Sequence, residues 1–524
     1  METVPDLTRQ VRLPLDIAVR PYLMDHRFEG KAVLPAVEAM QYLSASTRRH
    51  CPGLNVRSIE NAEFSRFLSL TPDVPRIEAV NEIEVHADGR VTSRLLTRTR
   101  SRSGITRTHT HVRMEFPPSH SAPVPLPADQ MFALGGIGMD IRSDKIYQSL
   151  VPFGPSFQNI QGELTVSAFG AITSVHAPDP GAPVEPLGSP FPLDAAFHAA
   201  CVYGQRFSGI VGFPVGLGYR YVFQPTEPKA SYLARIVPKR AAYDRLVFDI
   251  WITDMDGAPY EAVLGLIMQD VSAGRMMPPD WITLEPTEQG LSGDELGPLS
   301  DSGTRHCVME LSSVHEPAVK ALSEGEHERF NELGKRRQKS FLAARLCLKR
   351  LSRALCGHDA AIPASSIHTL ASDKIRPHCP LSDGRDAVYC SVSHDNRFVI
   401  AAASGSRVGV DVERLTEKVV KARHIYMHNG EIALTEDSLL GKISAALRVW
   451  STKEAMAKAF DIPLAEAWDR VTVTTIGKSK SELCYDRNIY EAVHHQVADH
   501  LFTLVDAGGE CKDPTAFQQF PNAV

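Results

Sequence analysis

The sequence predicts an α+β protein of two large parts, and three observations support this prediction. First, 524 residues are too many for one ordinary domain, because domains contain roughly 100–200 residues. Second, hydrophobic residues make up 43% and charged residues 23% of the chain, as in ordinary globular proteins. Third, the N-terminal half contains the same order of elements twice, a helix opened by proline and then several strands. The C-terminal half instead has a long basic helix ahead of its strands.

Segments rich in proline, glycine and serine mark the predicted boundaries of these parts. Residues 117–130 read PPSHSAPVPLPADQ and divide the N-terminal half into sub-folds at 1–116 and 131–273. Residues 274–304 have no lasting hydrophobic period and are predicted to be a linker. The C-terminal part is then expected at 305–524.

Each N-terminal sub-fold is predicted to contain one helix and several strands. The helices are expected at 35–46 and 192–207, because proline suits a first helical turn, where its missing N–H has no partner. Apolar patterns predict strands at 76–85, 91–98, 109–116, 232–237, 246–253 and 258–268.

The C-terminal part is predicted to begin with a basic helix at 334–355 that has one apolar face. The elements expected after it are strands at 387–393, 398–403 and 408–412 and a helix at 452–460. The basic run 335–353 is either a solvated face or a patch that binds anions.

Composition excludes several classes of protein. Acidic residues outnumber Lys and Arg by 62 to 56, which argues against general binding of nucleic acid. The sequence has no apolar run of about 18 residues, so no segment is expected to span a membrane. The nine cysteines are scattered without a C-x-x-C pair, which favours reduced thiols and a cytoplasmic location.

Two ionisable groups of the N-terminal half are candidates for acid–base chemistry. His26 lies in DHRFEGKAVLP, and Asp194 and His198 lie one helical turn apart in PLDAAFHAA. A neutral histidine is a suitable base near pH 7, and a carboxyl kept protonated by an apolar environment can act as an acid. The structural alternatives are a histidine that caps a helix and an aspartate favoured by the helix dipole.

These two motifs and the segment FGPSFQ between them resemble the dehydratase domains of polyketide and polyunsaturated fatty acid synthases. The resemblance covers about residues 5–273 and implies a double hotdog, in which each of two folds wraps a sheet around a helix. It also implies that His26 is the base and Asp194 the acid, with His198 orienting Asp194. Many of these dehydratases have tyrosine at the position of Phe153, so any role of that hydroxyl is lost here.

Carboxylates also gather in the C-terminal part. In VGVDVE, alternation places Asp411 and Glu413 on one face of a strand, and in WSTKEAMAKA the residues Glu454 and Lys458 share a helix face. Three carboxylates with a lysine suit Mg²⁺ and a pyrophosphate, because Mg²⁺ prefers oxygen ligands and lysine offsets phosphate charge. The structural alternative is a capping box of Ser451 with Glu454 and an ordinary helical salt bridge.

These motifs resemble the larger, pseudo-twofold 4′-phosphopantetheinyl transferases, and the resemblance covers about residues 305–505. Supporting matches lie earlier in the chain, in Ala344-Arg345, Arg376-Pro377 and Ser391-Val392-Ser393-His394. The resemblance implies transfer of phosphopantetheine from coenzyme A to a serine of an apo acyl carrier protein. It implies that Asp411, Glu413 and Glu454 hold Mg²⁺ and that Glu454 is also a general base. The residues expected to bind coenzyme A are Arg345, Arg376, His394, Lys453 and Lys458.

Together the two resemblances predict a bifunctional protein with an acyl carrier protein as partner, similar to the C-terminal end of iterative enediyne-type polyketide synthases. The dehydratase resemblance also suggests a homodimer through the hotdog half. Three alternatives remain open. The transferase alone is active and the hotdog half is a docking or scaffold module. The whole chain is a carrier-binding assembly protein. The hotdog half is a thioesterase.

Overall fold

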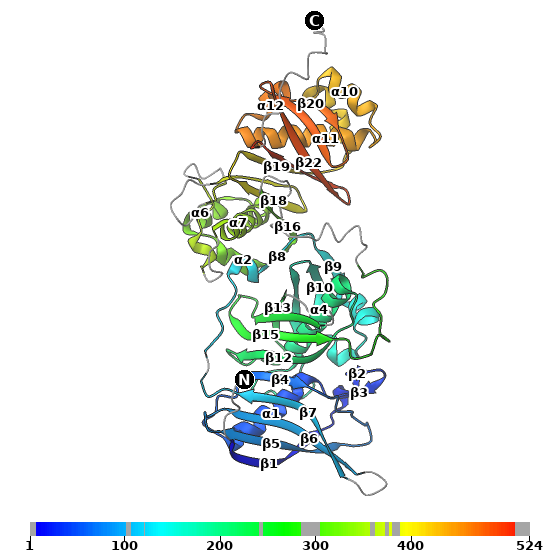
Figure 1. Cartoon of the computed structure of the whole chain (residues 1–524), viewed down its shortest axis with the longest axis vertical. Coiled ribbons are helices and arrows are strands. Elements are labelled where there is room, and N and C mark those ends of the chain that lie inside the picture. The colour runs from blue at the N-terminus through cyan, green and yellow to red at the C-terminus, as the bar shows by residue number, and fades with distance from the viewer. Residues whose placement is uncertain are drawn as a thin grey trace. The chain divides into compact units, whose positions relative to one another are not determined.

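The computed structural model describes residues 7–100, 106–119, 121–239, 245–283, 304–356, 362–371, 377–379 and 388–508. The chain forms two compact units of mixed helix and sheet, which confirms the α+β class (Figure 1). Unit 1 consists of Met1–Pro125 and Gly138–Gly290, and unit 2 of Leu126–Ile137 and Leu291–Val524. Most of the predicted linker, residues 284–303, lies outside the described residues.

Unit 1 is organised around one antiparallel sheet of twelve strands. In spatial order the strands are β1 (Leu7–Ala18), β5 (Arg76–His86), β6 (Val91–Arg100), β7 (Thr106–Phe116), β4 (Ser58–Phe64), β12 (Phe213–Val222), β15 (Pro259–Gln269), β14 (Arg245–Thr253), β13 (Ser231–Pro238), β11 (Gly170–His176), β10 (Ile160–Ser167) and β9 (Met139–Arg142). Pairing of β4 with β12 joins the strands of the two halves. All six predicted strands correspond to strands of this sheet.

Each half of the sheet packs against one long helix. Helix α1 (Ala36–His50) lies on the strands before β12, and α4 (Phe191–Ser208) lies mainly on β10 to β14. Helix α4 is buried along most of its length, and its four core alanines let the surrounding strands approach closely. Gly209 ends α4 with a left-handed φ of 65°. The arrangement confirms the predicted double hotdog.

Unit 2 contains two further antiparallel sheets, each packed on one long helix. The first has the order β17 (Tyr389–His394), β18 (Phe398–Ser404), β16 (Arg305–Val314) and β8 (Ala133–Gly135), with α7 (Lys335–Cys356) packed on β16 and β18. The second has the order β19 (Val408–Arg414), β23 (His500–Asp506), β22 (Asn488–Val497), β21 (Lys480–Tyr485) and β20 (Thr472–Ile476), with α11 (Lys442–Phe460) packed on β19 and β23.

A repeated buried ion pair shows that these two halves of unit 2 are related. Glu326 of α6 (Glu324–Glu332) lies 2.7 Å from the ammonium of Lys349, and Glu431 of α10 (Asn429–Glu436) lies 2.8 Å from that of Lys453. Each glutamate also accepts the backbone N–H of the residue three before it, which caps its own helix. Each lysine donates to two backbone carbonyls as well. The repeat confirms the predicted pseudo-twofold fold.

Two predicted boundaries differ from the structure. Residues 131–137 were expected in the second hotdog sub-fold, but they belong to unit 2 because β8 pairs with β16. The helix expected at 452–460 begins at Lys442, since no residue between Lys442 and Ser451 interrupts it. Ser451 therefore lies within the helix, and the capping-box alternative is wrong. Among the described residues, no helix is long and apolar enough to cross a bilayer.

Candidate functional site

The first candidate site begins at His26, which directly follows the short helix η1 (Pro21–Asp25). Asp25 fixes this position, because its carboxylate accepts hydrogen bonds from the backbone N–H and the hydroxyl of Ser156, at 3.0 and 2.6 Å. The backbone carbonyl of Asp25 also accepts the N–H of Gly154. A side chain at Gly154 would collide with that of Asp25. Glycine in the FGPSFQ segment therefore permits the close approach that holds His26.

The ring of His26 is oriented by a backbone bond. Its Nδ1 lies 3.0 Å from the carbonyl oxygen of Val33, so Nδ1 carries the hydrogen and Nε2 presents a lone pair. Nε2 in turn lies 3.9 Å from Oδ1 of Asp194. Burial lowers the pKa of His26 below its ordinary value of 6.5, although Asp194, when it is ionised, acts in the opposite direction. His26 is thus a neutral base near pH 7.

Asp194 and His198 approach His26 from the N-terminal end of α4. Both side chains are almost fully buried, and Nε2 of His198 lies 3.1 Å from Oδ2 of Asp194. The one-turn spacing in the sequence therefore brings both residues to the same place, as expected. The structure brings together all three residues predicted for this site.

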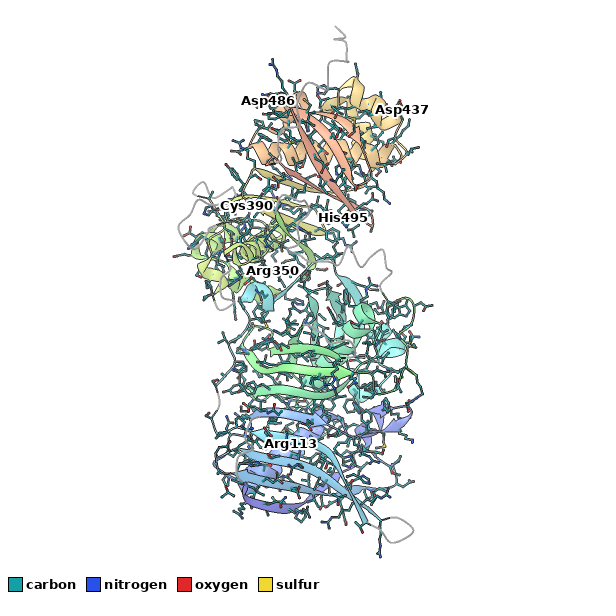
Figure 2. The ribbon with its side chains drawn as sticks, viewed as in Figure 1. Arg113, Arg350, Cys390, Asp437, Asp486 and His495 are labelled. Carbon is teal, nitrogen blue, oxygen red and sulfur yellow. The ribbon has the colours of Figure 1, made fainter. Side chains whose placement is uncertain are left out.

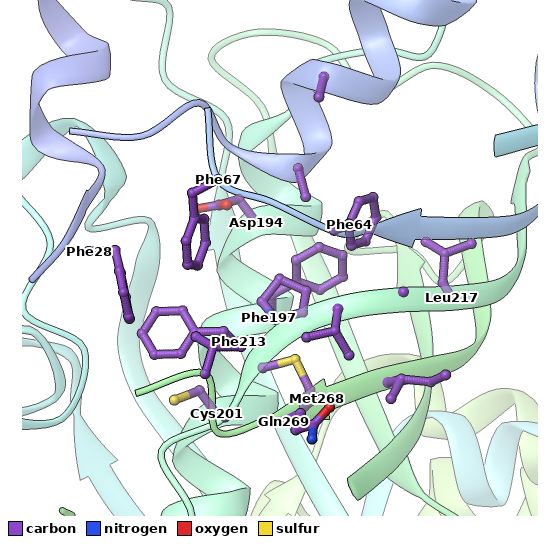
Figure 3. A pocket seen from close by; sticks show the side chains of 18 of the residues that line it. Phe28, Phe64, Phe67, Asp194, Phe197, Cys201, Phe213, Leu217, Met268 and Gln269 are labelled. Atoms are coloured by element: carbon purple, nitrogen blue, oxygen red, sulfur yellow. The ribbon is translucent and has the colours of Figure 1, made fainter. Parts of the chain in front are cut away.

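These residues line a cavity of about 1260 Å³ in unit 1. Aromatic rings form part of its wall, and Figure 3 shows those of Phe28, Phe64, Phe67, Phe197 and Phe213 around the space. Phe153 adds a ring stacked on His26, with centroids 4.5 Å apart. A largely apolar wall with a few converging polar groups suits an apolar chain that carries one reactive group.

The second candidate site lies where β19 meets α11. Asp411 and Glu413 come from the strand and Glu454 from the helix, and one carboxylate oxygen of each lies within 4.8 Å of the others. A side chain at Gly409 would collide with the backbone carbonyl of Ala455. The glycine of VGVDVE thus permits the close packing of strand and helix that assembles the acidic trio, Asp411, Glu413 and Glu454.

Lys458 and two serines surround the trio. The Lys458 ammonium lies 2.8 Å from Asp411 Oδ1 and 3.7 Å from Glu454 Oε2. The hydroxyl of Ser393 donates to Oδ1 of Asp411 at 2.9 Å, and that of Ser451 to Oδ2 at 2.8 Å. The sequence did not predict either serine role, although Ser393 lies in a motif quoted above and Ser451 appeared there only in the capping-box alternative.

The trio is crowded with negative charge. Burial, and then the charge of Asp411, raises the pKa of Glu413 to about 7 and that of Glu454 to about 8. A divalent cation bound between the three carboxylates would relieve this repulsion. The donor atoms are all oxygens, which Mg²⁺ prefers. These residues therefore fit a magnesium ion.

The residues expected to bind coenzyme A are placed differently from one another. His394 ends β17, and its pKa is lowered by partial burial and by the positive charges of Lys458 and Arg337 nearby. Arg345 is almost fully buried and donates to the backbone carbonyl of Thr369. Arg376 lies outside the described residues.

Lys453, which was expected to bind coenzyme A, is not placed for that role. Its side chain is fully buried, and its ammonium donates to Glu431 and to the backbone carbonyls of Tyr426 and Trp468. These three bonds use all three of its hydrogens. Lys453 therefore supports the fold and is not available to coenzyme A.

The basic run 335–353 also divides into two parts. Lys335, Arg336, Arg337 and Lys339 at its start are exposed, as a binding patch requires. The cations further along α7 are buried, namely Arg345, Lys349, Arg350 and Arg353. The anion-binding interpretation therefore applies to the first turn of the helix alone.

Comparisons with known proteins match each unit to a different family. Residues 134–278 match the polyketide synthase dehydratase N-terminal domain, and residues 407–505 match the 4′-phosphopantetheinyl transferase superfamily. A 4′-phosphopantetheinyl transferase of Aneurinibacillus migulanus is 26% identical over 114 residues, which are 20% of this chain and 48% of the relative. Enterobactin synthase component D of Salmonella austin is 28% identical over 183 residues, 34% of this chain and 72% of the relative.

Solved structures similar to this chain include two dehydratase domains. That of a mycocerosic acid synthase-like polyketide synthase is 19% identical and covers 52% of this chain and 99% of its own, with a TM-score of 0.40. That of a trans-AT polyketide synthase from Brevibacillus brevis is 16% identical and covers 50% of this chain and 93% of its own, with a TM-score of 0.40. The chain spans about half the length, 48%, of the transferase from Aneurinibacillus migulanus. The family matches confirm both resemblances seen in the sequence: one region of the chain is similar to polyketide synthase dehydratases and another to 4′-phosphopantetheinyl transferases.

Proposed function

We propose that this chain carries two enzymes that act on an acyl carrier protein. Unit 2 transfers the phosphopantetheine arm from coenzyme A to a serine of the apo carrier, with Mg²⁺. Unit 1 removes water from β-hydroxyacyl thioesters attached to the carrier. The observation that carries the first proposal is the acidic trio with Lys458 in contact with it.

In the transfer reaction, the serine hydroxyl of the carrier attacks the β-phosphorus of coenzyme A. A new phosphoester bond forms, the pyrophosphate bond breaks, and adenosine 3′,5′-bisphosphate leaves. Asp411, Glu413 and Glu454 would hold Mg²⁺, which would supply charge neutralisation at the pyrophosphate. Glu454 also accepts the serine proton, directly or through water. Lys458 contacts the pyrophosphate, and His394 with the exposed basic turn of α7 binds the remaining phosphates.

In the dehydration reaction, Nε2 of His26 accepts the proton from the α-carbon of the thioester. The electron pair forms the α,β double bond, and the bond from the β-carbon to the hydroxyl breaks. Asp194 donates the proton with which that hydroxyl leaves as water. Backbone N–H groups near Gly30, which lines the cavity, would stabilise the negative charge that develops on the thioester oxygen.

A direct test of the transferase is the mass of an apo carrier incubated with coenzyme A, Mg²⁺ and the full chain. We expect the carrier to gain the mass of one phosphopantetheine arm, and Glu454→Ala to prevent this gain. A parent chain that leaves the carrier unmodified would support the alternative of a carrier-binding assembly protein.

A β-hydroxyacyl carrier tests the second activity. We expect loss of water with the parent chain and not with His26→Ala. The alternative favoured by Phe153 is that unit 1 only docks the carrier, and it predicts carrier binding without loss of water. Release of free acid would instead indicate a thioesterase.

A further inference from the structure

A tyrosine outside the motifs contacts the histidine beside Asp194. Tyr147 lies in the short π-helical turn η2 (Ile146–Leu150), and its side chain is buried. Its hydroxyl oxygen lies 3.4 Å from Nδ1 of His198, and the two rings meet edge to face with centroids 5.8 Å apart. The same oxygen accepts the backbone N–H of Ile160 at 2.9 Å. The hydroxyl is therefore fixed from one side and faces the imidazole on the other.

This arrangement selects one tautomer of His198. The bond from Ile160 occupies a lone pair of the Tyr147 oxygen, so the hydroxyl hydrogen can point to Nδ1 of His198. Nδ1 then accepts, and the ring carries its hydrogen on Nε2, which lies 3.1 Å from Oδ2 of Asp194. The Nε2–H of His198 then lies beside Oδ2 of Asp194, and Oδ1 is the carboxyl oxygen that faces His26.

We propose that Tyr147 is a positioning residue of the dehydratase site, which acts by fixing the tautomer and ring of His198 and, through them, the carboxyl of Asp194. This inference rests on the proposed dehydration. Phe153, which packs against both His26 and His198, supplies a ring but no hydroxyl. Tyr147 supplies a hydroxyl to His198 from a different element, η2.

The test combines turnover with a spectroscopic measurement on Tyr147→Phe. We expect kcat to fall about tenfold with KM nearly unchanged, because one buried hydrogen bond is lost while the cavity keeps its shape. Nitrogen chemical shifts of ¹⁵N-labelled histidine, assigned with His198→Gln, should show that His198 loses its preference for the Nε2–H tautomer.

The matched control is Tyr203→Phe, which removes a buried hydroxyl of α4 that donates to the carbonyl of Ala168. It should leave kcat and the His198 signal at parental values. An unchanged tautomer in Tyr147→Phe, or a kcat loss no larger than in the control, would overturn the inference. A parent chain that removes no water would contradict the proposed function instead, and the tautomer measurement would still decide the role of Tyr147.

A second, independent observation concerns residues 126–137, which lie between the two hotdog halves in sequence but belong to unit 2. They form α2 (Ala128–Met131) and β8. The guanidinium of Arg350, labelled in Figure 2, donates to the carbonyls of Asp129 and Ala133 at 2.6 and 2.8 Å. Arg353 lies 3.3 Å from the fully buried carboxylate of Asp129. Two buried cations of α7 thus bind this segment.

Backbone bonds tie the same segment to β16 and the turn after it. Gly136 donates to the carbonyl of Val308 at 2.8 Å, and His315 donates to the carbonyl of Phe132 at 2.9 Å. The hydroxyl of Ser313 donates to the carbonyl of Leu134 at 2.9 Å. The segment therefore completes one edge of the first sheet of unit 2.

The internal repeat explains why the half of unit 2 that contains α7 binds residues 126–137, which come from an earlier part of the chain. Lys349 and Lys453 occupy equivalent buried positions, so Arg350 is the counterpart of Glu454. In the second half this helix position holds Glu454, which is part of the acidic trio. In the first half it holds Arg350, whose guanidinium donates to backbone carbonyls of residues 126–137. We infer that residues 126–137 are a structural part of the transferase and that cutting the chain at the linker would leave that enzyme incomplete.

The full chain with Ala133→Asp tests this inference, because Ala133 is completely buried in β8. We expect hydrogen exchange in α7 to increase and transfer to the carrier to fall at least tenfold, while α4 keeps its protection. The matched control is Ala171→Asp, at a completely buried position in β11 of unit 1, which should expose α4 and leave α7 protected. If Ala133→Asp cannot be purified, Asp129→Asn gives the same comparison in milder form. Faster exchange in α4 with α7 unaffected would overturn the inference.

Discussion

The two candidate sites use carboxylates in opposite environments. In unit 1, Asp194 lies with two histidines at the wall of a largely apolar cavity. In unit 2, three carboxylates share a space within 4.8 Å and contact a lysine. The first environment suits the movement of protons, since its base is neutral. The second suits a cation, since its negative charges repel one another.

This difference shows how one chain can support two kinds of chemistry without a shared site. Burial lowers the pKa of His26, which favours its neutral form. Burial, and then the charge of Asp411, raises the pKa values of Glu413 and Glu454, and a bound divalent cation would oppose this rise. Substitutions at one site should therefore leave the other activity intact.

The largest expected effect is in the trio. Glu454→Gln should lower transfer to the carrier about a thousandfold or more, because it removes both a metal ligand and the base. Carrier mass measured over time gives the rate. Asp437→Asn, at an exposed acid of the same unit, is the control and should transfer at the parental rate. Equal rates for the two variants would contradict the assignment.

His26→Ala should reduce dehydration by about 100- to 10,000-fold, which is the usual contribution of a general base. Formation of the unsaturated thioester can be followed by mass spectrometry of the carrier. The same variant should transfer phosphopantetheine normally, and a parallel loss of both activities would show that the sites are not separate.

Two neighbouring lysines of α11 should behave differently. Lys453→Met leaves the buried Glu431 without its partner and should destabilise unit 2 by about 3–5 kcal/mol. Lys458→Met should keep the fold but lose most of the transfer activity, because the Lys458 side chain is partly exposed beside the trio. Denaturant unfolding separates the two cases. A stable Lys453→Met protein with weak coenzyme A binding would restore the original prediction for Lys453.

Magnesium should stabilise unit 2. At a hundred times its dissociation constant, a ligand that binds only the folded protein adds about 2.7 kcal/mol, and Mg²⁺ should do so in thermal unfolding of the parent. Asp411→Asn should remove this gain. Stabilisation of equal size in the variant would place the ion elsewhere.

The smallest expected effect concerns pH. The base must be neutral, and burial lowers the pKa of His26, so the acidic limb of kcat/KM for dehydration should lie below pH 6.5. Phe153→Ala removes the ring stacked on His26 and admits water, which should move this limb upward toward 6.5. A limb above 6.5 in the parent would mean that a nearby negative charge outweighs burial.

The sequence predicted best what depends on local spacing. Period-two alternation placed Asp411 and Glu413 together, and helical spacing placed Asp194 beside His198. It could not predict contacts made across the fold, such as Tyr147 with His198 or Arg350 with residues 126–137. It also could not distinguish Lys453 from Lys458, because a motif does not reveal which helix face is buried. The proline-rich sequence of 117–130 predicted only a boundary between the two hotdog sub-folds, although its last residues form part of unit 2.

The most direct test of the central claim, two separate enzymes in one chain, measures both reactions on carrier protein with three chains in parallel. These are the parent, His26→Ala and Glu454→Ala. The parent should convert apo carrier to its phosphopantetheine form and remove water from a β-hydroxyacyl carrier. His26→Ala should lose only the second reaction, and Glu454→Ala only the first. Loss of both reactions in either variant, or neither reaction in the parent, would contradict the account.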